Sequence, residues 1–275
     1  MSGSALTVRQ RLAAYAGLAK IQISAQTIYR SNYLVSLLGL LFKVYLLKEV
    51  WVAAYPHSRA TMGHGQQISL SAQIAYSTLA SVQYFVFNPW TLSGIPERVR
   101  NGQVAVDLAR PVRYTAQMTF GQAGVMIAGL PFVIVALPFA ILVGGAEAPA
   151  SAGAGLGYAV SLVPAFLITL LTGSIVGITA FWTLETDGTS IIYRMVAQFF
   201  AGALVPLWFM PGWLETLASW LPFQATTYTP IAIYMGKSGS VVSTIGLQCV
   251  WVVVLWLILR LLAVRALRRV ALQGG

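Results

Sequence analysis

The sequence predicts an all-α membrane protein with six transmembrane helices, and two observations support this fold class. Charged residues make up only 9% of the 275 residues and hydrophobic residues 57%, whereas soluble domains carry about 25% charged residues. Six apolar stretches also approach or exceed the ~20 residues that a helix needs to cross the ~30 Å hydrocarbon core. Residues 1–275 are therefore predicted to form one transmembrane domain. Its spans run near 32–54, 67–90, 117–143, 157–184, 189–210 and 242–264.

The basic residues divide the connections into two sets, which predicts an orientation. Nearly all of the basic residues outside the spans lie in the two terminal segments and the second connection, and Arg194 follows the short fourth connection. The other three connections hold only Arg59 and Lys237. Since cytoplasmic loops carry an excess of Lys and Arg, both termini are predicted to be cytoplasmic. The net charge of +10 is scattered over helix ends. We therefore expect these residues to meet anionic lipid headgroups of the bilayer and not nucleic acid.

Residues 1–28 are predicted to form an interfacial helix that leads into the first span. Arg9 and Arg11 precede a short, alanine-rich apolar run, which Lys20 and Gln22 interrupt. A secretory leader has a continuous apolar core before its cleavage site, so we expect no cleavable signal here. A helix lying at the membrane surface fits this composition better.

Polar side chains follow one face of the first span. Tyr33, Ser36 and Lys43 recur at helical spacing, and Lys43 lies near the middle of the span. A charge at mid-bilayer costs at least ~2.5 kcal/mol, which makes these residues candidates for a translocation pathway. Two alternatives stay open: the span is shifted along the sequence, or the ammonium reaches an interface on its long stem.

The second span is unusually polar on one face. Gln73, Tyr76 and Gln83 share that face of a helix. Amides without partners cost several kcal/mol in hydrocarbon, so the face is expected to meet other helices or a wet cavity. Hydrogen bonding between helices and the lining of a pathway explain the pattern equally well.

The connection over residues 92–111 is too polar to cross the membrane but keeps an apolar spacing. Val99, Val104 and Leu108 alternate with basic residues, a pattern that predicts a short amphipathic element parallel to the membrane. Pro111 then begins the descent into the third span.

Proline interrupts the third and fourth spans. Pro131 and Pro138 in the third span and Pro164 in the fourth predict kinks, because proline removes a backbone donor and crowds the preceding turn. The Gly- and Ala-rich residues 144–157 are expected to form an external loop.

The segment before the last span is apolar but broken. Residues 211–223 contain Pro and Gly and are too short to cross, so one or two short re-entrant or interfacial helices are expected there on the outer side. Trp208, Trp213 and Trp220 are expected to lie in the aromatic belt at that interface.

Neither a catalytic nor a metal site is predicted. His57 and His64 are the only histidines, and the seven carboxylates are dispersed, with no pair at a metal-ligand spacing within one span. Gly236-Lys237-Ser238 resembles the end of a phosphate-binding loop, but Ile231 stands where the required earlier glycine would be. We therefore expect no cofactor on this chain.

Several short motifs in order resemble the membrane permeases of bacterial type-2 ATP-binding cassette (ABC) exporters. The most informative is Asp107-Leu-Ala-Arg-Pro111, at the end of the polar connection. The others, in chain order, are Phe181-Trp182, Pro206-Leu207, Met210-Pro211-Gly212-Trp213, Leu221-Pro222-Phe223, Tyr228-Thr-Pro230 and Tyr234-Met-Gly236.

The resemblance implies a permease that has no nucleotide site of its own. Two separate cytoplasmic ATPase subunits would bind ATP and Mg, and a second permease, identical or homologous, would complete the pathway in the bacterial inner membrane. The polar connection would be the coupling helix that docks on an ATPase, with the N-terminal helix as a second contact. The residues implied in coupling are Glu97, Arg98, Arg100, Asp107, Arg110 and Pro111, together with Arg9 and Arg11.

A stand-alone channel or secondary transporter is the alternative function. Secondary transporters commonly have coupling carboxylates or paired broken helices near the midplane. Carboxylates are nearly absent from the centres of these spans, so ion coupling has little to act through, and the exporter interpretation is favoured.

Overall fold

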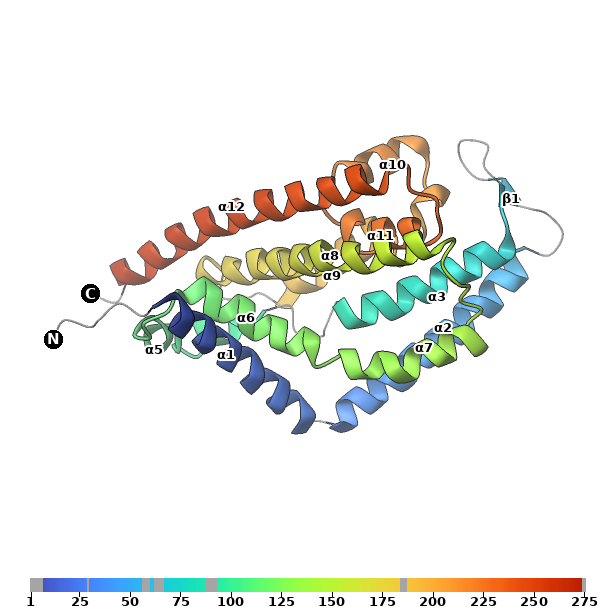
Figure 1. The fold of residues 1–275 in the computed structure, drawn as a ribbon. Helices are drawn as coiled ribbons and strands as arrows, with labels where there is room; N and C mark the ends of the chain where they lie inside the picture. Colours follow the sequence, from blue (N-terminus) through green and yellow to red (C-terminus); the bar gives the residue numbers. More distant parts are fainter. Residues whose placement is uncertain are drawn as a thin grey trace.

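The computed structural model describes residues 7–28, 30–55, 60–61, 67–87, 93–183 and 187–273 as an elongated helical bundle (Figure 1). Within these residues the only strands are a two-residue antiparallel pair, β1 (Ala60–Thr61) and β2 (Gln67–Ile68). The predicted all-α class is therefore confirmed. His57 and His64 lie outside the described residues.

Helical elements make up most of the described chain. In chain order they are α1 (Val8–Ile28), α2 (Arg30–Ala54), α3 (Leu70–Phe87), α4 (Ile95–Arg100), α5 (Val104–Leu108), α6 (Tyr114–Ile127), η2 (Leu130–Phe132), α7 (Val133–Leu142), α8 (Ala152–Ile178), η3 (Thr179–Phe181), α9 (Asp187–Phe200), η4 (Leu207–Phe209), α10 (Gly212–Ser219), η5 (Gln224–Thr226), α11 (Tyr228–Tyr234) and α12 (Val241–Gln273).

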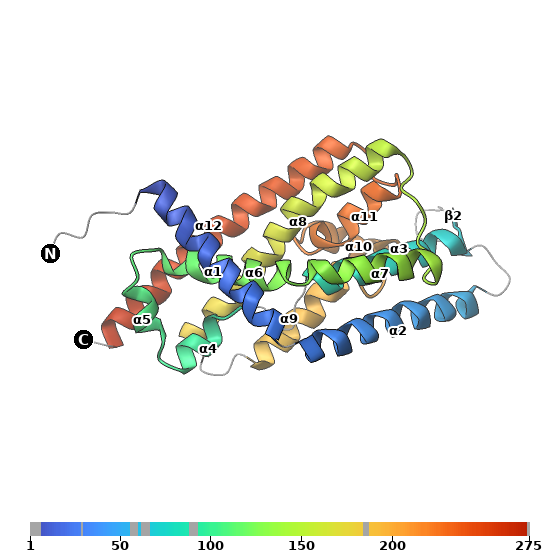
Figure 2. The same cartoon turned by 60° about the horizontal axis from the view of Figure 1, so that its bottom comes forward.

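Helix α1 lies along α6, and α2 then packs against α3 (Figure 2). The rings of Tyr15 and Phe120 stack with their centroids 4.9 Å apart. Gly124 lets the two backbones meet, because a Cβ at this position would lie 2.4 Å from the carbonyl oxygen of Ala19. The helix expected over residues 1–28 is present from Val8, and its position at the membrane surface stays a prediction.

Proline has different effects at its three predicted kinks. The third span is broken between α6 and α7, where Pro131 lies in the η2 turn. Pro138 and Pro164 instead lie inside α7 and α8, and each helix continues past its proline. The break between α6 and α7 lets α7 pack on α2 and α3 while α6 packs on α1 and α8.

The fifth span differs from its predicted extent of 189–210. Helix α9 ends at Phe200, and the backbone turns at Gly202, which has a φ of 73°. This left-handed conformation favours glycine, and a Cβ there would also lie 2.7 Å from the Tyr76 hydroxyl. At 1.5 Å per residue, α9 is only about 21 Å long.

Three helical segments are long and apolar enough to cross a membrane by themselves. They are Tyr114–Leu142, Ala152–Phe181 and Val241–Arg269 among the described residues. Two short helices, α10 and α11, fill the segment before the last of them, where short helices were predicted. Trp213 and Trp220 are 71% and 76% exposed, and their place in an aromatic belt stays a prediction. Trp208 is buried, so its predicted place in the belt is wrong.

Alanine substitutions at two glycines of α6 should change stability in opposite directions. Gly124→Ala should lower the free energy of unfolding by about 1–3 kcal/mol, because the new methyl group overlaps the Ala19 backbone. Gly121→Ala should raise it by about 0.5–1 kcal/mol, because alanine favours the helix and its Cβ would only touch the Gln22 side chain at 3.8 Å. Thermal unfolding in detergent measures both; equal shifts of one sign would contradict this packing.

Candidate functional site

The polar connection between α3 and α6 forms two short helices, α4 and α5, joined by a turn over residues 101–103. Gly102 makes this turn with a φ of 69°. The element lies at the end of the bundle where α1 begins and α12 ends (Figures 1 and 2). The distribution of basic residues predicts that this connection and both termini lie on one side, and their location at one end of the bundle agrees with that; the coupling role, which the resemblance implies, stays a prediction.

Apolar contacts fix the start of α4 to the ends of α8 and α12. Ile95 is buried in one cluster with Ile178, Phe181 and Leu259. Ser93, just before α4, also packs closely on α8, because a Cβ added to Gly177 would lie 2.5 Å from the Ser93 hydroxyl oxygen. A displacement of α4 would therefore act first on α8 and η3, against which α4 packs, because packed interiors yield little.

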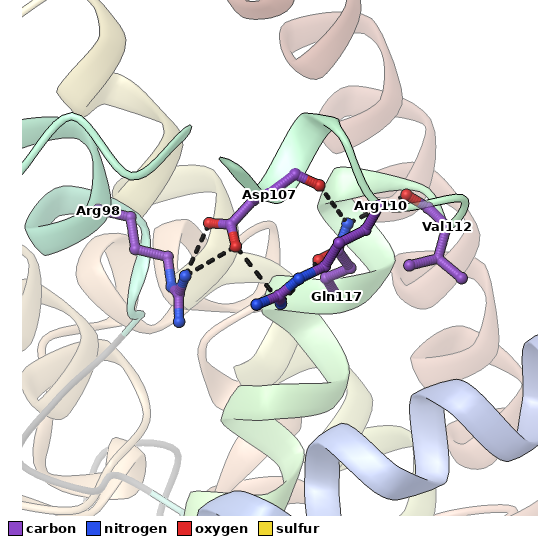
Figure 3. A network of polar contacts seen from close by, with 5 residues as sticks. All are labelled: Arg98, Asp107, Arg110, Val112 and Gln117. Atoms are coloured by element: carbon purple, nitrogen blue, oxygen red, sulfur yellow. Dashed lines mark hydrogen bonds and ion pairs between the residues drawn. The ribbon is translucent and has the colours of Figure 1, made fainter. Parts of the chain in front are cut away.

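A buried carboxylate holds α4 and α5 together (Figure 3). Asp107 is fully buried, and Arg98 Nη1 donates to both of its oxygens, at 2.7 Å to Oδ1 and 2.8 Å to Oδ2. Arg110 Nη1 lies 3.4 Å from Oδ1 on the other side. Two guanidinium groups thus replace the water that this carboxylate loses on burial.

Gln117 of α6 completes the network. Its Nε2 donates to the carbonyl oxygens of Asp107 at 2.9 Å and Val112 at 3.0 Å, and its Oε1 accepts from Arg110 Nη1 at 3.3 Å. These bonds join the end of α5 and the following turn to the first turn of α6. Gln117 was not among the residues predicted from the sequence, although an amide at the start of an apolar span is a signal for such a role.

The network leaves a positive and partly apolar surface on the element. The side chains of Arg98 and Arg110 keep 30% and 42% exposure while they neutralise one carboxylate. Glu97, Arg100 and Pro111 are exposed, as surface contacts require. Val106, which was also not predicted from the sequence, is 63% exposed on the same element.

A cavity of about 370 Å³ separates this element from α1. Glu97, Arg98 and Arg110 line it from one side, and Leu18 and Ile21 of α1 line it from the other. Arg9 and Arg11 are exposed near the start of α1 and do not border this cavity. Their contact with an ATPase, like that of the exposed residues on α4 and α5, stays a prediction.

The polar face of α3 is buried inside the chain. Trp208 Nε1 donates to Gln73 Oε1 at 3.1 Å, and Tyr76 donates its hydroxyl hydrogen to the Gly202 carbonyl at 2.9 Å. Gln83 Nε2 donates to the Thr226 carbonyl at 2.7 Å. The three side chains therefore make hydrogen bonds inside the chain. This is one of the two explanations that the sequence left open for the polar face. A pathway role for them stays a prediction.

The pathway candidates on α2 whose side chains are described are less buried than those on α3. Lys43 is partly buried, and its Nζ lies 5.9 Å from the ring centroid of Tyr84 on α3. Ser36 is exposed, and the side chain of Tyr33 lies outside the described residues. Lys48, near the other end of α2, donates to the Val143 carbonyl at 2.9 Å. The structure does not bring these α2 residues together with Gln73 and Tyr76.

Removing the charge of Asp107 should loosen the α4–α5 element. Asp107→Asn would leave two arginines facing each other without a counter-charge, which should cost about 1–3 kcal/mol given their partial exposure. The expected result is faster tryptic cleavage at the arginines of this element. Glu97→Gln is the matched control, because Glu97 is an exposed carboxylate on the same element. Equal cleavage rates in the two variants would contradict the network's role.

Among the described residues, no three His, Cys, Asp or Glu side chains gather in a way that could hold a metal ion. The Asp107 network braces the α4–α5 element and leaves an exposed basic surface on it. This arrangement suits transmission of a displacement.

Comparison with known proteins gives one match. The family model described as ABC-2 family transporter protein matches residues 50–274 of the 275. The matched range contains all helices from α3 to α12 and hence the whole Asp107 network. No curated protein and no solved structure matches the chain.

Proposed function

The chain belongs to the ABC-2 family of transporters, and from this premise we propose that it is the permease subunit of an ATP-driven exporter. The family places it among the multi-pass membrane components of transport complexes that associate with ATP-binding cassette subunits. The finer proposal is that two copies, or one copy and a homologous permease, form the pathway. Two cytoplasmic ATPase subunits would bind the ATP and Mg.

The braced α4–α5 element is the observation that carries this proposal. An ATPase that closes around ATP can drive a permease only through a part that does not deform under load. The Asp107 network supplies such a part, because charged hydrogen bonds join α4 to α5 and the Gln117 amide joins α5 to α6. Its anchor on α8 and α12 then carries the movement into the helices that are long enough to span the bilayer.

The exposed residues of the element would make the contact, and the buried one would position them. Glu97, Arg100, Val106 and Pro111 are accessible to a partner's groove. Asp107 has no exposed surface, so its proposed role in coupling is to hold Arg98 and Arg110. Arg9 and Arg11 would add contacts from α1.

We place six crossings in the bilayer, with the α4–α5 element and both termini on the cytoplasmic side of a bacterial inner membrane. The crossings would be α2, α3, α6 with α7, α8 with η3, α9 with the residues that follow it, and α12. Because α9 is only about 21 Å long, the turn at Gly202 and the η4 segment would complete the fifth crossing. Helices α10 and α11 would then lie in the outer leaflet region.

Transport would follow an alternating-access cycle. ATP binding would favour one of two arrangements of the permease pair by its differential affinity for them. Rigid-body movement of α4, α8 and α12 would reshape the interface between the two permeases. Export is the proposed direction because the motifs of the chain resemble exporter permeases.

Charge reversal at Arg100 tests the docking proposal, because Arg100 is exposed on α4 and does not belong to the Asp107 network, whereas Arg98 holds Asp107. Arg100→Glu should reduce substrate-stimulated ATPase activity and transport of the reconstituted complex at least about tenfold, a change that corresponds to one lost charged contact. The control is Arg268→Glu, which changes an exposed arginine of α12 at the same end of the bundle. Full coupling in the Arg100 variant, or failure of any ATPase to copurify with the wild-type chain, would contradict the proposal.

Accessibility of the turn between α4 and α5 tests the orientation. Asn101→Cys, made in a Cys249→Ser chain that has no other cysteine, should react with a membrane-impermeant maleimide in inverted vesicles but not in intact cells. Ser238→Cys is the opposite control, because it lies in the turn before α12 at the far end of the bundle. Labelling of Asn101→Cys from outside the cell would overturn the arrangement.

A further inference from the structure

A second cavity, of about 420 Å³, lies at the end of the bundle opposite the α4–α5 element. Helix α11, the η5 turn and the first turns of α12 enclose it, and Figure 1 shows these elements at the end far from α5. Neither the Asp107 network nor the candidate residues on α2 and α3 border it. It is therefore separate from the coupling site.

Lys237 is the one charged residue that lines this cavity. Gly236 turns the chain with a φ of 65°, and the backbone amides of Lys237 and Ser238 both donate to the Ala232 carbonyl. The Lys237 ammonium then lies 4.9 Å from the ring centroid of Trp208. Among the described residues it has no carboxylate partner within ion-pair distance, and burial lowers its pKa. Lys237 is nevertheless an exposed residue, so an anionic ligand can reach its ammonium.

The rest of the lining suits an oxyanion. Tyr228, Thr229 and Ser238, which line the cavity, carry hydroxyl groups. The hydroxyl groups of Ser243 and Thr244 already donate to the Ser240 carbonyl. The first turn of α12 adds the positive end of a helix dipole. Glu215 of α10 acts electrostatically on Tyr228 but does not line the cavity.

The cavity also borders a surface that faces lipid. Leu247 and Trp251 of α12 both line the cavity, and Leu247 is also half exposed on the outer surface of the helix. Further along α12, Val250, Val254 and Leu257 are exposed on a helix that is long and apolar enough to span the membrane. The exposed Trp213 and Trp220, on α10 and at its end, mark the interface level at the same end of the bundle. A ligand with a charged head and an apolar tail fits both surfaces together.

We propose that this cavity binds the headgroup of an anionic phospholipid, with the phosphate at Lys237 and an acyl chain along α12. The proposal depends on membrane insertion and not on coupling to an ATPase. One cation and several hydroxyl groups suit a single phosphate that carries a hydroxylated headgroup. The apolar border at Leu247 favours a lipid over a soluble anion, which would gain nothing from it.

Native mass spectrometry of the purified full-length chain, kept with any subunits that remain bound, tests this site. After delipidation, phosphatidylglycerol should bind at least about tenfold more tightly than phosphatidylcholine. Lys237→Gln should abolish this preference, and Lys237→Arg should retain it, because a charged hydrogen bond is equivalent to about tenfold or more in affinity. Lys48→Gln is the matched control, since Lys48 also lies on the outer half of its helix but bonds to Val143 outside the cavity.

Two further arms separate the alternatives. Ser243→Leu, at an exposed position of the first turn of α12, should fill the cavity and weaken phosphatidylglycerol binding even if Lys237→Gln impairs folding. Glycerol 3-phosphate should compete only weakly, because it lacks the acyl chains. Equal competition by the soluble phosphate would show a soluble-anion site and overturn the lipid assignment. An unchanged preference in Lys237→Gln and Ser243→Leu would overturn the site itself.

Discussion

Buried polar groups must find their partners inside the chain, because neither a packed protein interior nor the hydrocarbon around it offers any. In this protein the constraint is met at a few places where distant segments meet, and those places hold the bundle together. Asp107 takes its donors from Arg98 and Arg110, and Gln117 closes the same network from α6. Without these partners the carboxylate would need water, and the α4–α5 element would lose the polar bonds that join its two helices to each other and to α6.

The same constraint organises the opposite end of the molecule. The polar face of α3 binds the irregular segments after α9 through Tyr76 and Gln83. Gln248 of α12 accepts from the Ser161 hydroxyl at 2.9 Å and donates to the Ala225 carbonyl at 2.8 Å. Short helices with broken backbones can thus lie at membrane depth, because buried amides and hydroxyls satisfy the carbonyl groups that their turns leave free.

Helices α8 and α12 connect the two ends. They pack side by side along the bundle (Figure 1), and their ends at the α4–α5 side share an apolar cluster with Ile95. The other halves of the two helices are joined by the Ser161–Gln248 bond, and that half of α12 borders the cavity at Lys237. In the proposed arrangement, a movement that enters at α4 would reach the cavity at Lys237 through these two helices.

Composition and spacing were sufficient to predict a helical membrane protein, a short amphipathic element over residues 92–111 and short helices before α12. These features depend on local chemistry: apolar length, charge at helix ends, and the breaks that Pro and Gly impose. The early end of α9, the burial of Trp208 and the role of Gln117 could not be predicted in this way. Each depends on a partner far away in the sequence or on another helix, such as Tyr76 for the turn at Gly202 or Gln73 for Trp208.

For the candidate site, the sequence by itself determined which residues carry charge in the α4–α5 element and near which helix ends they lie. Only the tertiary structure decided that Asp107 is enclosed while Glu97 and Arg100 face outward. The reason is geometric. Periodicity and composition describe one helix at a time, whereas burial and ion pairing depend on how close two helices come. That distance is set by side chains such as Ile95 and by glycines such as Gly177, which meet only in the folded bundle.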